Sequence, residues 1–431
     1  MDLLLQLVEW LGLNNANVRY VLAGVILLGA STAVVGTFTF LRKKSLLGDA
    51  IAHAVLPGIC LAFILFNTKN PFVLLIGAAI TGWLSTVVID VITAKSRIKP
   101  DTAIALVLSV FFGTGMLLLT SIQHSGNAAQ SGLDHFLFGK AAALIGIDVL
   151  MIAIVSVVLL IAVLIYFKAF TLISFDKTFA YSLGVPVALY EIILSTLTVL
   201  AICVGIQAVG VVLMAALLIT PAATARYWTN SLPTMLLLAV LFSILASVGG
   251  VFVSYAIPAM PTGPWIIVFI SIFAFISILV APARGILPKI FKGRKTKEIV
   301  YNENILKCLY HLGEAENNFE GKRNITDIQQ RRFFNIVKLK QGLAKLRRAD
   351  YITETKNSWA LTEMGTKEGA RIARLHRLWE LYLNTFLKMP KDHVHQGAEV
   401  IEHFITPEIE EMLLAELNNP TRDPHDREIP Y

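Results

Sequence analysis

The sequence predicts an all-α polytopic membrane protein with a soluble, highly charged domain after its last spanning helix. The first observation is an uneven distribution of charge: residues 1–283 hold 12 Lys and Arg and 9 Asp and Glu, whereas residues 284–431 hold 25 and 21. The second is a series of apolar runs of about 20 residues, the length that a helix needs to cross a ~30 Å hydrocarbon core. We therefore expect a membrane region over residues 1–285 and a soluble region after it.

Nine apolar runs follow one another, and each is interpreted as one spanning helix. They cover residues 18–41, 46–66, 71–93, 102–121, 146–167, 187–206, 208–227, 233–256 and 263–282. Between the fourth and fifth runs, the segment 122–144 holds His124, Asp134 and His135. This segment is compatible with a loop, a re-entrant piece or an amphipathic helix.

Basic residues cluster in every second loop of this membrane region. The clusters contain Arg42, Lys43, Lys44, Lys95, Arg97, Lys99, Lys168, Lys177 and Arg226. Because cytoplasmic loops carry an excess of Lys and Arg, this pattern predicts an external N-terminus and a cytoplasmic C-terminal domain. Residues 286–297 form a basic linker between the two regions.

Composition narrows the choice of function only slightly. The net charge of +7 is compatible with a membrane surface or a nucleic acid and selects neither. Cys60, Cys203 and Cys308 lie far apart, so no disulfide framework is expected. The sequence has no GxxxxGKS or GxxxxGKT motif, so this chain carries no phosphate-binding loop of its own.

Asp49 and His53 lie four residues apart within the second apolar run. On a helix this spacing places both side chains on one face, with Cβ atoms about 5–6 Å apart. A carboxylate and an imidazole are costly in hydrocarbon and usually face a pathway or a partner. Together they supply half of the ligands of a site for manganese, iron or zinc. These ligand types do not discriminate well among the three metal ions. The alternative is a helix-start Asp near the membrane surface and a His that a neighbouring helix satisfies.

Three separated motifs resemble the manganese/zinc/iron permeases of ABC transporters, the ABC-3 family. They are LGDAIAHAVLPG at 47–58, GVVLMAALLITPAATA at 210–225 and PTGP at 261–264. The resemblance implies that Asp49 and His53 bind the ion in transit. It also implies an ABC ATPase subunit, an extracytoplasmic metal-binding protein and a second permease subunit, identical or paralogous, as partners. Hydrolysis would belong to the ATPase, so the chain itself would not be an enzyme.

The same resemblance gives a role to the segment FDKTFAYSLGVP at 175–186. It is similar to the short coupling helix that docks on the ATPase, with Asp176, Ala180 and Gly184 as its candidate residues. Asp176 is placed as an N-cap, and Gly184 is suited to end the helix in a left-handed conformation. From the residues alone, a generic helical loop is the alternative.

The C-terminal third resembles the iron- and manganese-dependent repressors of the diphtheria-toxin-repressor family. The resemblance rests on ALTEMG at 360–365, RLHRLWE at 374–380, the stretch from His395 to His403 and the tail from Asn419 to Pro430. It implies a winged helix-turn-helix over residues 298–365 and a helical metal-binding and dimerisation domain over 366–431. The implied ligands of a divalent transition metal are His376, Glu380, His395, Glu399, Glu402 and His403. Three carboxylates and three imidazoles suit Mn²⁺, Fe²⁺ or Zn²⁺, and a Glu where some relatives carry a Cys favours Mn²⁺.

This chain departs from that pattern in its first cytoplasmic helix. Relatives supply further ligands there, but Asn304 and Lys307 occupy the matching positions. The candidate recognition helix, residues 335–348, offers phosphate contacts through Lys338, Lys340, Lys345, Arg347 and Arg348. A basic helix beside a membrane has the same composition, so DNA binding by the intact chain is not favoured.

We therefore expect the permease subunit of a bacterial plasma-membrane ABC importer for Mn²⁺, Zn²⁺ or Fe²⁺, with a cytoplasmic metal-sensing domain that gives feedback. The alternative is a membrane-tethered or proteolytically released metal-dependent transcriptional regulator. An ATP-independent secondary transporter is disfavoured, because the segment 175–186 would then have no role.

Overall fold

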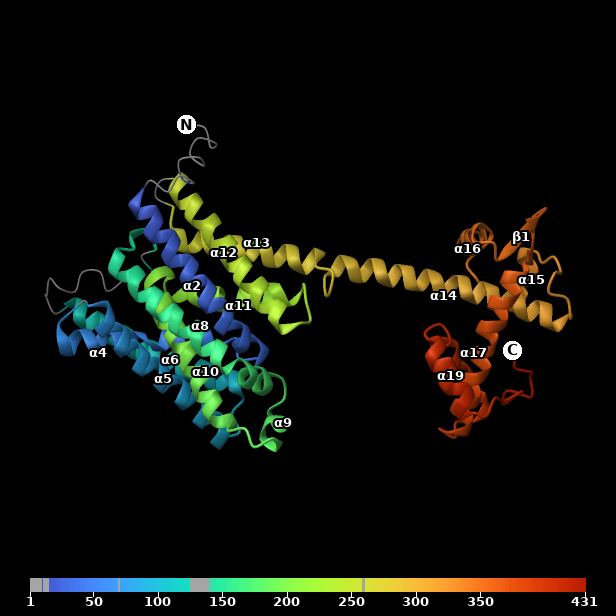
Figure 1. Ribbon diagram of the computed structural model, residues 1–431, viewed down its shortest axis with the longest axis horizontal. Helices are drawn as coiled ribbons and strands as arrows, with labels where there is room; N and C mark the ends of the chain where they lie inside the picture. The colour runs from blue at the N-terminus through green and yellow to red at the C-terminus, as the bar shows by residue number, and fades with distance from the viewer. Residues whose placement is uncertain (1–9, 11–14, 69, 125–138, 140, 258–259) are drawn as a thin grey trace. The chain divides into compact units, whose positions relative to one another are not determined.

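The computed structural model describes residues 10, 15–68, 70–124, 139, 141–257 and 260–431 of the chain. The chain divides into two units, Met1–Lys289 and Ile290–Tyr431, which Figure 1 traces from blue to red. The expected segment 122–144, with Asp134 and His135, falls largely outside the described residues.

All the regular elements in the described part of unit 1 are helices. Its elements are α2 (Ala16–Leu41), α3 (Leu47–Ala54), α4 (Leu56–Phe66), α5 (Pro71–Lys95), α6 (Pro100–His124), η2 (Ala141–Ala143), α8 (Gly146–Phe175), α9 (Lys177–Ser182), α10 (Val187–Val209), α11 (Val211–Arg226), α12 (Leu232–Ala256) and α13 (Thr262–Val280). The long helix α14 (Ile286–Ala315) begins in unit 1 and continues into unit 2.

Eight helical segments in the described residues are long and apolar enough to cross a membrane. They include α3 and α4 together as one span, Leu47–Phe66. The seventh expected span, at 208–227, is α11 in the structure and has only 16 residues. The physical reason lies at Gly210, whose positive φ of 86° ends α10 and starts α11 in a new direction.

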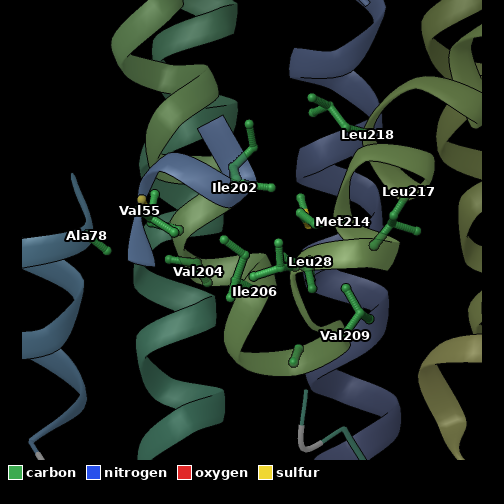
Figure 2. Close-up of a cluster of buried hydrophobic side chains, with 14 of the residues drawn as sticks. Leu28, Val55, Ala78, Ile202, Val204, Ile206, Val209, Met214, Leu217 and Leu218 are labelled. Atoms are coloured by element: carbon green, nitrogen blue, oxygen red, sulfur yellow. The ribbon is translucent and has the colours of Figure 1, made fainter. Parts of the chain in front are cut away.

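Helix α2 lies among α8, α10, α11 and α12, and it packs against all four. Figure 2 shows Leu28 of α2 with Ile206 of α10 and Met214 of α11 in the shared apolar core. Buried hydroxyls also link the helices: Oγ of Ser31 lies 3.0 Å from Oγ of Ser156 on α8. Such bonds replace water inside a membrane bundle.

The break between α3 and α4 falls at Val55, two residues before Pro57 in the first turn of α4. Proline is tolerated there because the first N–H groups of a helix have no partner within it. Helix α4 then packs closely on α5, since a Cβ at Gly58 would lie 2.1 Å from the carbonyl oxygen of Gly77. The short helix α3 contacts α5, α6, α10 and α11.

Unit 2 contains the rest of α14, seven further elements and a separate apolar core. The elements are α15 (Ile325–Arg331), α16 (Ile336–Arg348), β1 (Ile352–Thr355), β2 (Ser358–Leu361), α17 (Glu363–Thr385), α18 (Lys391–Ile401) and α19 (Pro407–Glu416). Strands β1 and β2 form an antiparallel hairpin, joined by Lys356 and Asn357, which both have positive φ as a two-residue hairpin turn requires. The apolar core of unit 2 includes Leu309 of α14, Leu343 of α16 and Ile372 of α17.

Candidate functional site

Asp49 and His53 form the polar face of α3, whose other side chains are mostly buried. Nε2 of His53 lies 3.6 Å from Oδ1 of Asp49, and the side chains are 21% and 47% exposed, respectively. The buried residues of the helix are Leu47, Gly48, Ala50, Ile51, Ala52 and Ala54. The packing of α3 therefore fixes the direction in which the two polar groups point.

The surroundings of His53 are apolar on one side. Its ring contacts Phe112 of α6 edge to face, with ring centroids 4.9 Å apart. Its Nδ1 is buried and has no hydrogen-bond partner in the part of the chain that the structure describes. The other ring nitrogen, Nε2, faces Asp49 and is the atom that a cation shared with the carboxylate would meet. The pair thus has the chemistry of half a metal site.

The segment 175–186 forms the short helix α9 and its flanks. Asp176 caps the helix by accepting the backbone N–H of Phe179 at 2.9 Å, and Ala180 is fully buried. Gly184 follows with φ of +72°, and a Cβ there would meet nothing within 4 Å. Large apolar side chains of this segment are exposed, namely Phe175, Phe179, Tyr181 and Leu183. The segment therefore presents an apolar surface on a capped helix.

In unit 2, His376, Glu380 and His395 form a cluster whose ligand atoms all lie within 4.8 Å of one another. Helix α17 supplies His376 and Glu380, one turn apart, and α18 supplies His395. Nε2 of His376 lies 3.1 Å from Oε1 of Glu380 and 3.0 Å from Nδ1 of His395. Nδ1 of His395 lies 2.9 Å from the same Glu380 oxygen. Two imidazoles and one carboxylate converging on one point fit a divalent transition metal.

The charges around this cluster are strongly coupled. Burial opposes a charged imidazole at His376, but Glu380 and Glu402 outweigh it and raise the pKa of His376. Burial likewise opposes a charged carboxylate at Glu380, yet His376 and His395 hold the pKa of Glu380 at about 2. The carboxylate is therefore ionised and ready to bind a cation, whereas a proton on His376 must leave first.

Lys307 of α14 enters the same cluster as a buried cation. Its Nζ donates to both oxygens of Glu402 at 2.8 Å and lies 3.1 Å from Nδ1 of His376. The Lys307 side chain is 7% exposed and that of Glu402 is fully buried. Burial lowers the pKa of Lys307, and the Glu402 carboxylate opposes that shift. Glu402 is thus already neutralised by an ammonium group.

The other two expected ligands also have partners. Oε1 of Glu399 lies 2.6 Å from the guanidinium of Arg332, and Nδ1 of His403 lies 2.5 Å from Oε2 of Glu303. Arg332 and Glu303 were not singled out in the sequence, because they lie 67 and 100 residues away from these partners. The structure therefore brings three of the six expected ligands to one point. Glu402 also contacts Nδ1 of His376, and Glu399, Glu402 and His403 are each held in an ion pair.

A cavity of about 780 Å³ opens beside the cluster. Its lining includes His376, Glu380, His395 and Glu399. The His395 side chain is 60% exposed. An ion can therefore reach the three ligand atoms from this cavity.

The basic residues of α16 fall into two groups. Lys345 pairs with Glu298 and Arg347 with Glu354. The other three are exposed and have no ion pair within the described residues: Lys338, Lys340 and Arg348. Only this second group is free to contact phosphate groups.

Two family models match the chain. Residues 14–281 match "ABC 3 transport family", and residues 362–431 match "Iron dependent repressor, metal binding and dimerisation domain". The first match spans the described helices of unit 1 up to α13, including Asp49, His53 and α9. The second contains His376, Glu380 and His395.

Known proteins resemble the chain over the same regions. It is 41% identical over 375 residues to "Manganese transport system membrane protein MntC" of Bacillus subtilis, covering 87% of this chain and 86% of that protein. It is 43% identical to "Zinc transport system membrane protein TroC" of Treponema pallidum, covering 65% and 95%. The solved structure "PsaBC from Streptococcus pneumoniae in complex with Fab" is 35% identical with a TM-score of 0.58, covering 64% of this chain and 97% of that one.

Proposed function

The chain belongs to the ABC 3 transport family, and on that basis we propose that it is the permease subunit of an importer for divalent transition metal ions, with Mn²⁺ as the favoured cargo. It is a multi-pass membrane component of a bacterial transport system, and it carries a metal-binding domain of the iron-dependent repressor type. The observation that carries the proposal is the Asp49–His53 pair on α3, within the region that matches the family.

The pair acts on the cargo ion through two properties. The Asp49 carboxylate supplies charge that offsets the loss of the ion's water shell, and the His53 imidazole supplies a nitrogen ligand. ATP-driven closure of the pathway then weakens the pair's hold on the ion and releases it inward.

A second permease subunit completes the pathway. Half of the Asp49 side chain is exposed on unit 1. An ionised carboxylate facing lipid is costly, so this face is expected to meet another permease subunit, identical or paralogous. An extracytoplasmic metal-binding protein delivers the ion to the pair.

The exposed apolar surface of α9 is the docking point for the ATPase subunit. The cap at Asp176 and the buried Ala180 hold the helix rigidly, and the left-handed Gly184 turns the chain back toward α10. A rigid, apolar helix suits transmission of movement from the ATPase to the spanning helices. Hydrolysis takes place in the ATPase, and the permease is not an enzyme.

Unit 2 is proposed to face the cytoplasm and to sense metal there. The basic loops of unit 1 support this orientation. His376, Glu380 and His395 would hold the ion, and loading would slow transport when cytoplasmic metal is plentiful. The ligand geometry and the family match of residues 362–431 support this role.

A second candidate function is that of a membrane-tethered or proteolytically released regulator. Helices α15 and α16 with the β1–β2 hairpin have the element order of a winged helix-turn-helix. The exposed Lys338, Lys340 and Arg348 favour phosphate contacts. Operator binding by the released unit, with no ATPase partner required, would distinguish this function from feedback.

Metal uptake by the reconstituted assembly tests the proposal. Proteoliposomes that contain the permease, its ATPase and its binding protein should take up ⁵⁴Mn²⁺ in an ATP-dependent manner. Competition by unlabelled Zn²⁺ and Fe²⁺ ranks the cargo ions. Uptake that is independent of ATP would contradict the assignment.

A further inference from the structure

The start of α14 is the most noteworthy feature that the transport function leaves unexplained. Helix α14 begins six residues after α13 ends, at Ile286. From residue 284 to residue 297 the chain has six basic residues and no Asp or Glu. They are Arg284, Lys289, Lys292, Arg294, Lys295 and Lys297.

Hydrogen bonds fix this start to unit 1. The backbone N–H of Arg284 donates to the carbonyl oxygen of Tyr227 at 3.2 Å, and its guanidinium donates to Oδ1 of Asn230 at 3.0 Å. The backbone N–H of Gly285 donates to Ala281 O at 2.7 Å. Tyr227 and Asn230 belong to the loop between α11 and α12, so α14 starts at the ends of spanning helices.

The first turns of α14 are amphipathic, and most of their side chains are exposed. Ile286, Leu287, Ile290 and Phe291 are 46%, 42%, 44% and 63% exposed and follow the spacing of one helix face. Every residue from 289 to 299 is exposed. An exposed apolar stripe bordered by basic side chains marks a site of interaction with a protein or a membrane.

We propose that residues 286–297 bind the anionic phospholipid headgroups of the membrane that unit 1 spans. The four apolar side chains would enter the headgroup–acyl boundary, while Lys289 and Lys292 on the other side of the helix, and Lys295 at the edge beside Phe291, contact phosphates. Two observations select this partner. The charge of the segment is entirely positive, which matches an anionic surface, and the segment is continuous with the last spanning helix.

Depth-dependent quenching in nanodiscs tests this binding on the full chain. One variant carries a fluorophore at Phe291→Cys on the apolar face. The matched variant carries it at Thr296→Cys, about 140° away around the helix. The native cysteines Cys60, Cys203 and Cys308 are buried, so labelling is confined to the new position. The lipids are phosphatidylcholine with brominated acyl chains, with or without phosphatidylglycerol.

The expected result is strong quenching at position 291 with phosphatidylglycerol, much weaker quenching in phosphatidylcholine alone, and weak quenching at position 296 in both. Since each basic residue near an anionic surface favours association about fivefold, K289Q/K292Q/K295Q should weaken it by roughly a hundredfold. The variant K289R/K292R/K295R keeps the charge and should keep the quenching.

Three outcomes would overturn the proposal. Equal quenching in both lipid mixtures would remove the role of anionic headgroups. Equal signals at positions 291 and 296 would remove the oriented helix. A signal at position 291 that depends on protein concentration and not on lipid would identify a second copy of the chain as the partner.

Discussion

The ammonium group of Lys307 lies 2.8 Å from both carboxylate oxygens of Glu402, and both side chains are buried in unit 2. A carboxylate that the family resemblance implies as a metal ligand is therefore satisfied by a cation of the chain itself. One consequence is that binding of an ion to Glu402 would have to displace the ammonium. The ligand atoms that converge on one point are those of His376, Glu380 and His395.

Replacing this cation by an acid should enlarge the metal site. In the double variant Asn304→Asp/Lys307→Glu, two carboxylates join Glu402, and Mn²⁺ affinity should rise by roughly tenfold or more. Without metal, the same variant should be less stable, because Glu402 loses its partner in a buried position. Equilibrium dialysis and thermal unfolding of the full chain measure both effects.

The measurement uses an Asp49→Ala background, so that only unit 2 contributes to binding. The control is Lys367→Glu, because the Lys367 side chain is 76% exposed and its pair with Glu363 contributes little. Unchanged affinity in the double variant would show that Lys307 does not compete with metal.

Acid should weaken binding of Mn²⁺ to unit 2. The pKa of His376 is raised, so the protonated form is favoured in the folded chain without metal. That form contributes stability below the ordinary pKa of His, about 6.5, and the contribution is lost as pH rises through the raised pKa. Metal requires the neutral imidazole, so affinity should fall as pH decreases from 8 to about 6, with proton release on binding.

Calorimetry in two buffers of different ionisation enthalpy measures the released protons. His393→Gln serves as the control, because His393 is exposed and lies outside the cluster. A proton release of zero at pH 6–7 would mean that His376 takes no part in binding.

The proposed role of α9 in coupling to the ATPase has a backbone test at Gly184. Gly184→Val should reduce copurification of the ATPase and ATP-driven uptake, since φ of +72° is strained for a β-branched residue. No atom lies within 4 Å of an added Cβ, so a defect would come from conformation and not from a clash.

Gly184→Asn is the matched variant, because Asn adopts left-handed conformations readily, and its effect should be clearly milder. Normal ATPase binding in the valine variant would leave residues 175–186 as an ordinary loop.

Several features of the fold could be predicted from the sequence because local signals decide them. The run predicted at 71–93 is α5, Pro71–Lys95, which starts at a proline and is capped by Asn70. The run at 46–66 is interrupted at Val55, two residues before Pro57. The run at 208–227 does not form a full span. The mean hydropathy of the run does not detect the positive φ of Gly210, which separates α10 from α11.

The candidate site was predictable only in part, for a similar reason. Helical spacing places His376 and Glu380 on one face, and the structure has them 3.1 Å apart. The ion pairs of Glu399 with Arg332 and of His403 with Glu303 depend on tertiary packing between α18 or its end and distant segments. No local pattern encodes such pairs.

Feedback by unit 2 predicts that uptake depends on internal metal. Proteoliposomes preloaded with increasing Mn²⁺ should show slower uptake with the full chain, whereas the His376→Ala/Glu380→Ala variant and a chain lacking residues 298–431 should keep their initial rates. Identical rates for all three at every internal concentration would exclude feedback and leave the regulator function as the better explanation.

The transport pair on α3 is the centre of the account. Asp49→Ala and His53→Ala should each abolish uptake while membrane insertion and ATPase binding stay intact. Asp49→Asn should be nearly as damaging, because the amide keeps the shape of the side chain but loses its charge.

The most direct measurement is the initial rate of ATP-dependent ⁵⁴Mn²⁺ uptake by proteoliposomes that contain Asp49→Asn beside the unaltered chain. The account predicts a rate near that of liposomes without ATP, with normal copurification of the ATPase as evidence of correct assembly. A rate equal to that of the unaltered chain would contradict the assignment of Asp49 and His53 as the transport site.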